Sequence, residues 1–500
     1  MLRWLRWVAS VPCPDPTGSE AVASAIPVVM TTFSAVVTTG IYCRPGCGAR
    51  PRADNVRTFD LAEAAEAAGF RACLRCRPYR IAGSVPWEAP ELVCRAVQMI
   101  IAGALDEGTE ADLGGRLGLS SRHLRRLFHE HLGLTPDQFA RSRRAHFARR
   151  LLDDTDLTIA DVAFASGFGS LRQFNRTMRE IFRLSPQQLR QRRRRTDRLV
   201  TDGGLVLRLP VTGAFDWDAM LAFFADRAIP GVEAVAGDVY CRTIMLDGAP
   251  GLLEVTPCGD DHLLLRAHLP YWEGLTHVVE RVRRLLGLDV DPSPAVQLAL
   301  DPVIGSLIRA RPGLRVPGAW TPFEIGVRAI IQQHCEHAEA STRMGRLVQA
   351  LGPAIPGLPR GLTYCFPAAE AVATADLTVS DLSPAMADTV RRFAGAVASG
   401  DIRLDGSVDL EALIASVTAI PGIGTTAAHH LALRLGERDA FPHADPSVLH
   451  ALRAFDPGAE DPAATAEAWR PWRSLAATHL LAPPGNDHAR LSYLSVSAVE

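Results

Sequence analysis

Four cysteines in the first eighty residues form two close pairs, Cys43 with Cys47 and Cys73 with Cys76. Three residues separate the first pair, two separate the second, and 25 residues lie between the pairs. Four thiolates with this spacing suit the tetrahedral coordination of zinc. A segment this short also has too small an apolar core to fold without such a crosslink. We therefore predict one Zn²⁺ bound by all four cysteines.

The sequence around these cysteines contains three further recognisable motifs, at 38–47, at Asn55-Val56 and at 67–76. They closely resemble the N-terminal zinc domain of Ada-type adaptive-response regulators. The resemblance implies that Cys43 is both a zinc ligand and a sacrificial nucleophile, which takes the methyl group from a methyl phosphotriester in DNA. Zinc would hold the sulfur as thiolate, and the loss of one negative charge on methylation would tighten DNA binding. A purely structural zinc site is the alternative.

Two later segments have the spacing of helix-turn-helix units. In each we predict a short helix, a turn that contains glycine, and a second helix that exposes Arg, Gln or Asn: 111–117 with 122–128, and 159–165 with 171–178. Such a second helix is what insertion into the major groove of DNA requires. Residues 141–198 contain 15 arginines against six acidic residues, which also favours contact with a polyanion.

The second of these units has a recognisable order of residues: Ile159-Ala160-Asp161-Val162-Ala163, Gly167-Phe168, Phe174-Asn175-Arg176 and Ser185-Pro186. This order resembles the AraC-type DNA-binding domain, which implies a double helix-turn-helix. A charged helical bundle without a DNA-binding role is the alternative. Our candidates for contact with bases or phosphates are Arg122, Arg125, Arg172 and Gln173.

A Pro-Gly-x-Gly turn at 421–424 separates two predicted helices in the C-terminal half. Such a turn presents backbone amides at the N-terminus of the second helix, where the helix dipole also favours an anion. We therefore expect Gly422, Ile423 and Gly424 to bind a DNA phosphate. Asp445 follows 21 residues after Gly424. By itself, an aspartate at such a position is most simply a helix cap.

The hairpin together with Phe441-Pro442 and 469–474 resembles the helix–hairpin–helix DNA glycosylases, specifically the 3-methyladenine glycosylase II family. The stretches 228–233 and 311–320 resemble the same family. The resemblance implies that Asp445 is the catalytic carboxylate, which would stabilise the oxocarbenium-like sugar or orient water after the base is flipped out.

Three positions of the base pocket follow from the same resemblance: Thr426, His430 and Leu481. Family members commonly carry aromatic residues there.

The chain contains no lysine, so all 53 residues counted as Lys or Arg are arginines. A chain without lysine cannot form a Schiff base through a side-chain amine, so we expect a monofunctional glycosylase that only hydrolyses the glycosidic bond.

These segments predict a multidomain, mainly α chain that includes one α+β domain. Short alternating runs at 205–209, 241–246, 252–257 and 262–269 predict the antiparallel strands of that domain. The predicted domains are an Ada-type zinc domain (1–83), an AraC-type double helix-turn-helix domain (86–195), an α+β N-terminal glycosylase subdomain (200–300) and a helix–hairpin–helix glycosylase domain (301–500).

We therefore expect an alkylation-response transcriptional regulator fused to a DNA-3-methyladenine glycosylase, with methyl transfer to Cys43. The alternative is a non-catalytic, damage-sensing transcription factor with a degraded glycosylase half. The expected partners are double-stranded DNA, at promoters and at alkylated lesions, and RNA polymerase. No apolar run reaches transmembrane length, so we expect a cytoplasmic, nucleoid-associated protein without a membrane partner.

Overall fold

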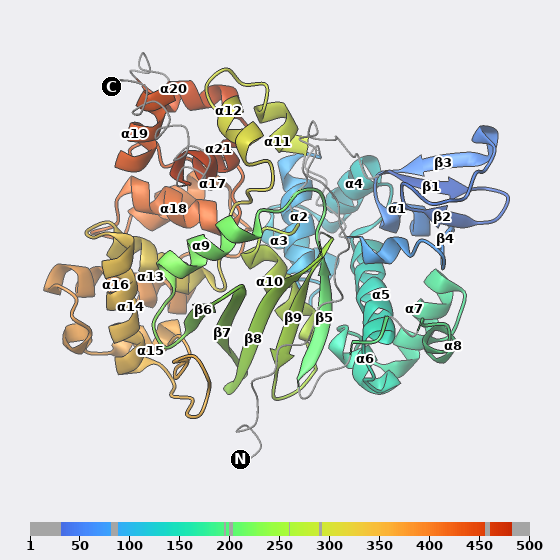
Figure 1. The fold of residues 1–500 in the computed structure, drawn as a ribbon, viewed down its shortest axis with the longest axis horizontal. Coiled ribbons are helices and arrows are strands. Elements are labelled where there is room, and N and C mark those ends of the chain that lie inside the picture. The colour runs from blue at the N-terminus through green and yellow to red at the C-terminus, as the bar shows by residue number, and fades with distance from the viewer. Residues whose placement is uncertain are drawn as a thin grey trace, which may run out of the picture.

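The computed structural model describes residues 32–81, 89–194, 197–199, 204–259, 261–289, 293–455 and 461–482. Within them an antiparallel sheet lies between two groups of helices, and a small second sheet lies at one end of the molecule (Figure 1). The predicted class, mainly α with an α+β domain, is confirmed. None of the described helices has both the length and the apolar character needed to cross a membrane.

The small sheet belongs to the cysteine-rich segment and has the strand order β3-β1-β2-β4. Strand β2 ends at Cys43 and pairs in parallel with β4, which ends one residue before Cys73. This pairing brings the two cysteine pairs together. The elements are β1 (Phe33–Val36), β2 (Ile41–Cys43), η1 (Ala53–Asn55), β3 (Val56–Phe59), α1 (Ala62–Ala67), β4 (Arg71–Ala72) and η2 (Pro78–Arg80).

Seven helices form the double helix-turn-helix region, as predicted. The long helix α5 joins the two units, and capping boxes at Thr109, Thr135, Thr158 and Ser185 begin four of the helices. The helices are α2 (Glu91–Ile101), α3 (Glu110–Arg116), α4 (Ser121–Leu132), α5 (Pro136–Asp154), α6 (Ile159–Ala165), α7 (Leu171–Phe182) and α8 (Pro186–Gln191).

The larger sheet is antiparallel throughout, with the order β5-β9-β8-β7-β6. All four predicted strands are present. The edge strand β6 was not predicted, since it is only four residues long and lies directly between two turns. The elements are β5 (Leu205–Pro210), α9 (Trp217–Arg227), β6 (Glu233–Ala236), β7 (Val239–Leu246), β8 (Ala249–Cys258), β9 (His262–His268) and α10 (Leu275–Leu285).

The C-terminal half packs around one apolar core that contains Val327, Phe393 and Trp469. Ala295 and Leu298 of α11 already belong to this core. Its helices are α11 (Ser293–Leu298), α12 (Gly305–Ala310), α13 (Pro322–Gln332), α14 (His337–Leu351), α15 (Ala369–Thr374), η4 (Leu377–Ser380), α16 (Pro384–Ser399), α17 (Leu410–Thr418), α18 (Thr425–Leu435), α19 (Pro446–Phe455), α20 (Pro462–Ala466), η5 (Glu467–Trp469) and α21 (Arg473–Leu481).

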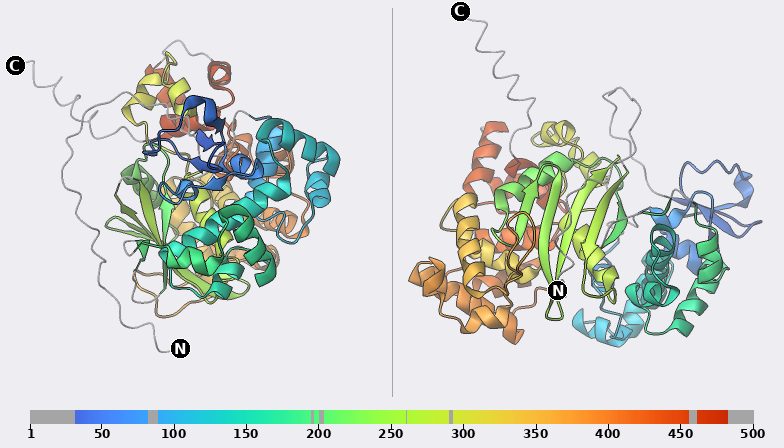
Figure 2. Two further views of the ribbon diagram at one scale, coloured as in Figure 1. Left: turned by 90° about the vertical axis from the view of Figure 1, so that its right-hand side faces the viewer. Right: turned by 60° about the horizontal axis from the view of Figure 1, so that its bottom comes forward.

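The units are packed against one another, as the two views in Figure 2 show. A single apolar cluster contains Tyr42 of the zinc unit, Phe174 of the second helix-turn-helix unit and Leu265 of the large sheet. At the end of α5, Asp154 accepts hydrogen bonds from Arg80 at 3.1 Å and from Arg208 at 2.9 Å. The boundary between the predicted zinc domain (1–83) and the predicted helix-turn-helix domain (86–195) lies in residues 82–88, outside the described part of the chain.

Candidate metal centre, DNA-binding helices and active site

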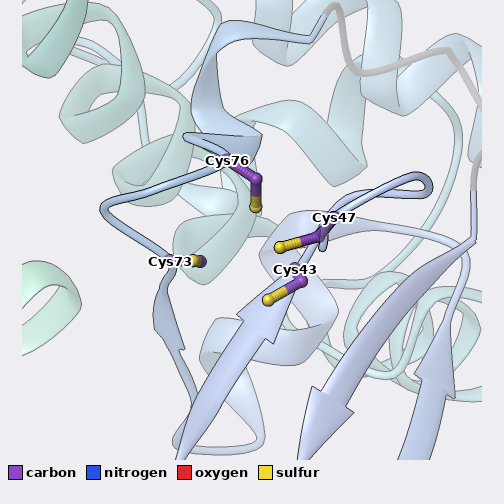
Figure 3. A group of neighbouring side chains, drawn as sticks. All are labelled: Cys43, Cys47, Cys73 and Cys76. Atoms are coloured by element: carbon purple, nitrogen blue, oxygen red, sulfur yellow. The ribbon is translucent and has the colours of Figure 1, made fainter. Parts of the chain in front are cut away.

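The four predicted zinc ligands converge on one point. The sulfur atoms of Cys43, Cys47, Cys73 and Cys76 all lie within 4.8 Å of one another. Figure 3 shows Cys43 at the end of its strand, with the other three on the loops that follow β2 and β4. The turn after Cys43 closes through a hydrogen bond from the Cys47 amide to the Arg44 carbonyl at 3.3 Å. This donor set fits one tetrahedral Zn²⁺.

The electrostatics of the cluster favour a bound cation if all four cysteines are to ionise. Burial and the neighbouring Cys76 and Cys73 sulfurs raise the pKa of the Cys43 thiol, and burial raises the pKa of Cys76 to about 12. Four thiols this close cannot all ionise unless a positive ion offsets their repulsion. A divalent metal would hold all four as thiolates, and Cys43, the most buried of them, would then be a zinc-bound nucleophile.

A buried polar network, which we did not predict, links this cluster to helix α5. Tyr42, directly before Cys43, donates its hydroxyl to Glu66 Oε1 at 2.6 Å. The same carboxylate lies 2.7 Å from His146 Nε2, and its second oxygen accepts the Ser142 hydroxyl. Because His146 and Ser142 lie on α5, the zinc unit is fixed to the helix that joins the two helix-turn-helix units.

The four candidates for DNA contact lie on the second helices of their units, α4 and α7. Arg122 and Arg172 are exposed, and Gln173 is half-exposed. Arg125 is also exposed, but its guanidinium forms an ion pair with Glu110 of the preceding helix. A phosphate would therefore compete with Glu110 for Arg125. Phe128, Phe168 and Phe174 are buried, as residues of the core would be.

The hairpin between α17 and α18 has the predicted turn, with Gly422 at a φ of 97°. Two of its amides differ from our expectation, because they are not free to bind a phosphate: the Ile423 amide donates to the Ile420 carbonyl at 3.2 Å, and the Gly424 amide is bonded to a side chain. The Gly424 amide donates to Gln333 Oε1 at 2.6 Å, and Gln333 Nε2 donates to the Gly422 carbonyl at 3.2 Å. Gln333 follows α13, so a neighbouring helix holds the hairpin in shape. Any phosphate must then bind the remaining amides at the start of α18.

Asp445 precedes helix α19 and is bound on both carboxylate oxygens. Oδ1 accepts the backbone amides of Ser447 at 2.7 Å and Val448 at 3.4 Å, which is the helix cap that the sequence suggested. Oδ2 lies 2.7 Å from His430 Nε2. Burial raises the pKa of Asp445, but the His430 contact and the two backbone amides lower it by more, so the net pKa lies below its usual value. Asp445 is therefore an anion at neutral pH.

The surroundings of this pair are rich in histidine and arginine. His337, the first residue of α14, lies 2.5 Å from a guanidinium nitrogen of Arg227 on α9. Burial, Arg227 and Arg328 lower the pKa of His337 to about 4, so its ring is neutral at pH 7. The contact between Arg227 and His337 was not predicted from the sequence, because 110 positions separate the two residues.

The three predicted pocket positions lie on two helices. Thr426 and His430 are one turn apart on α18 and share a face. Leu481 ends α21 and packs, half-buried, against the core of the C-terminal half. His430 lies within hydrogen-bond distance of Asp445.

Parts of the chain match three known families: the metal binding domain of Ada over residues 28–79, a helix-turn-helix domain over 113–192, and the AlkA N-terminal domain over 206–321. DNA-3-methyladenine glycosylase 2 of Escherichia coli is 31% identical over 274 residues, which cover 53% of this chain and 93% of that protein. A 3-methyladenine DNA glycosylase structure from Archaeoglobus fulgidus aligns with a TM-score of 0.49 at 21% identity, over 55% of this chain and 96% of that one.

The probable bifunctional transcriptional activator/DNA repair enzyme AlkA of Mycobacterium tuberculosis is similar over most of its length. The two chains are 37% identical over 454 residues, which cover 89% of this chain and 91% of that one. The aligned part is long enough to include both the DNA-binding half and the C-terminal half. The chain therefore belongs to the family of bifunctional transcriptional activator/DNA repair enzymes AlkA.

Proposed function

We propose that this protein is an alkylation-response transcriptional regulator fused to a monofunctional DNA-3-methyladenine glycosylase. The glycosylase half hydrolyses the N-glycosidic bond of alkylated bases in double-stranded DNA, with Asp445 as the catalytic carboxylate. The observation that carries the proposal is the position of Asp445, an anion at the start of α19 that contacts the hairpin helix α18 through His430. A flipped nucleotide would bring its sugar to this anion.

The absence of lysine supports hydrolysis without strand cleavage. The positive charge that develops on the sugar needs an anion nearby, and Asp445 provides one. Thr426, His430 and Leu481 are the proposed contacts with the flipped base. Gly422, Ile423 and Gly424 shape the hairpin that would approach a DNA phosphate, with Gln333 supporting it.

We propose a second reaction at the metal centre, in which Cys43 takes a methyl group from a DNA methylphosphotriester. The thiolate sulfur forms a bond to the methyl carbon, the carbon–oxygen bond breaks, and the phosphate keeps the electron pair. The product has one negative charge fewer on the cysteine cluster, so its repulsion from DNA phosphates falls. The methylated form would then bind promoter DNA through Arg122, Arg125, Arg172 and Gln173, and recruit RNA polymerase.

This function implies that the protein works in the cytoplasm, at the nucleoid. We propose that the units 1–83, 86–195, 200–300 and 301–500 divide the work, the first two for sensing and promoter binding and the last two for excision. Limited proteolysis should cut first between these ranges. Cuts within them at the same rate would contradict the division.

The glycosylase proposal is tested by incubating the purified protein with duplex DNA that contains 3-methyladenine or 7-methylguanine. Wild type should release the base and leave the strand uncut, while Asp445→Asn should retain only background release. Asp439→Asn is a matched control, since the Asp439 side chain is 18% exposed, much like that of Asp445, but binds Arg470 and Arg473 and not His430. Equal release by wild type and Asp445→Asn would remove the enzyme assignment. Binding to alkylated duplex without any release would favour a damage-sensing transcription factor.

Methyl transfer is tested separately by mass spectrometry after incubation with methylated DNA. A gain of one methyl group at Cys43 is expected, and Cys335, which lies outside the cluster, should remain unmodified. If Cys43 stays unmodified in zinc-loaded protein, the metal centre is structural only.

A further inference from the structure

The contact between His430 and Asp445 has a consequence for catalysis that rests on the glycosylase function proposed above. His430 lies on α18 and Asp445 on the loop before α19, and their side chains are 24% and 17% exposed. The Nε2–Oδ2 distance of 2.7 Å is typical of a hydrogen bond to an ionised partner. Together with the Ser447 and Val448 amides on Oδ1, three donors hold the carboxylate in one orientation.

The position of the hydrogen follows from the ionisation of Asp445. An ionised carboxylate only accepts hydrogen bonds, so the hydrogen in this contact is on His430 Nε2. Each carboxylate oxygen has two acceptor sites. Ser447 and Val448 occupy both sites on Oδ1, and His430 occupies one on Oδ2. One acceptor site therefore remains for a substrate or a water molecule.

We propose that His430 is a positioning residue for the glycosylase reaction, which keeps Asp445 ionised and aimed so that it stabilises the positively charged sugar. In the reaction the bond between C1′ and the base nitrogen breaks, and its electron pair leaves with the base. A purine alkylated at N3 or N7 carries a positive charge, so it departs as a neutral base and needs no acid. Water then forms a bond to C1′ and releases its proton to solvent, while His430 retains its Nε2 hydrogen throughout.

The charges around the pair show why the ionised state of Asp445 matters. His430 is faced by Asp445 and by His337 of α14, with Arg227 of α9 and Arg328 of α13 behind His337. The adjacent His429 of α18 also interacts electrostatically with His430. Asp445 is the one acidic group among these residues. A neutral Asp445 would leave the site without an anion, so it could no longer stabilise a cationic sugar.

Two substitutions separate hydrogen bonding from packing. His430→Phe keeps a planar ring but removes the donor, whereas the side-chain amide of His430→Gln retains a donor near the same place. In single-turnover excision, His430→Phe should be about 10- to 100-fold slower than wild type, which is typical of losing a group that orients a catalytic residue. The acidic limb of its pH–rate profile should move to higher pH, because Asp445 loses a hydrogen bond that favours its ionised form. His430→Gln should recover most of the rate and of the acidic limb.

A binding measurement makes the test independent of turnover. A duplex with a pyrrolidine abasic analogue presents a cation where the sugar charge develops, and a tetrahydrofuran analogue is its neutral counterpart. Wild type should bind the pyrrolidine duplex more tightly than the tetrahydrofuran duplex. His430→Phe should lose most of this preference near pH 5. It should still bind the tetrahydrofuran duplex like wild type, because that analogue carries no base for residue 430 to contact, and this binding also shows that the variant is folded.

The outcomes distinguish this inference from the proposed function. If wild type releases no base but shows the pyrrolidine preference and loses it in His430→Phe, the excision function fails and the positioning role stands. If His430→Phe keeps the wild-type acidic limb and the wild-type preference, the positioning role is overturned. Equal impairment of the Phe and Gln variants would overturn it as well, because the loss would then reflect packing and not hydrogen bonding.

Discussion

The carboxylate of Glu66 lies 2.7 Å from the imidazole of His146, across the boundary between the zinc unit and helix α5. Glu66 also accepts the hydroxyl of Tyr42, the residue before the zinc ligand Cys43. The metal centre is therefore joined to the DNA-binding helices by buried hydrogen bonds. Two contacts, Tyr42 with Glu66 and Glu66 with His146, therefore connect the residue next to Cys43 with α5, the helix that joins the two helix-turn-helix units.

Glu66→Ala should destabilise the zinc-loaded protein by about 3 kcal/mol, because it leaves buried partners without an acceptor. The measurement is chemical denaturation followed by tryptophan fluorescence. Glu130→Ala, an exposed acidic residue on α4, is the control and should change the free energy of unfolding little. An equal effect of the two substitutions would show that Glu66 does not hold the units together.

The same pair predicts a pH dependence of stability. Burial lowers the pKa of His146, but the charge and hydrogen bond of Glu66 raise it more, so the net pKa lies above the usual value. A raised pKa in the folded state contributes stability that is fully present below the unfolded-state pKa and is lost as pH rises through the folded-state pKa. Unfolding free energy should therefore fall from pH 6.5 upward, and Glu66→Gln should flatten this slope. An unchanged slope in Glu66→Gln would contradict the assignment.

Gly422→Ala should disrupt the hairpin. An added Cβ would lie 2.2 Å from Thr389 Oγ1, and the φ of 97° already disfavours a side chain. Gly436→Ala is a matched control, since Gly436 has a φ of 93° and nothing within 4 Å of an added Cβ. We expect the Gly436 variant to lose about 1 kcal/mol of stability and the Gly422 variant clearly more. Adding Thr389→Ala should restore part of the difference in thermal unfolding.

Gln333→Ala should weaken DNA binding by the C-terminal half. Its amide group bonds both the Gly424 amide and the Gly422 carbonyl, so its loss would free the turn at a cost of about 1–2 kcal/mol. The adjacent Gln332→Ala is the control. Affinity for a duplex with an abasic analogue, measured by fluorescence anisotropy, should fall only for Gln333→Ala. If both variants bind like wild type, the hydrogen bonds of Gln333 to the hairpin have no role in DNA binding.

Removal of zinc should disorder the cysteine-rich segment and weaken promoter binding. The small sheet depends on bringing two distant cysteine pairs together, and four close thiols without a cation repel as they ionise. Cys76→Ser should lose the metal, as measured by its release to a chromogenic chelator, and should show lower affinity for promoter DNA. Cys335→Ser should retain one zinc per chain. Full zinc occupancy in Cys76→Ser would exclude this ligand.

Much of this protein could be predicted from its sequence, because the relevant signals are local. The spacing within each cysteine pair (Cys43 with Cys47, Cys73 with Cys76), the glycine turns between helices and the alternating strands each depend on residues a few positions apart. The strand β6 escaped prediction since four residues carry little periodicity. Family resemblance added the interpretation of Asp445, whose local sequence alone indicates only a helix cap.

The contacts that complete the sites were decided by tertiary structure. Gln333 meets the hairpin across 91 residues, Glu66 meets His146 across 80, and His430 meets Asp445 across 15. None of these pairs has a spacing that a helix or strand period would produce. They form because packed helices bring distant side chains together, and burial then makes each polar group require a partner. The sequence by itself determined which chemistry is present, and only the fold determined which residues hold it in place.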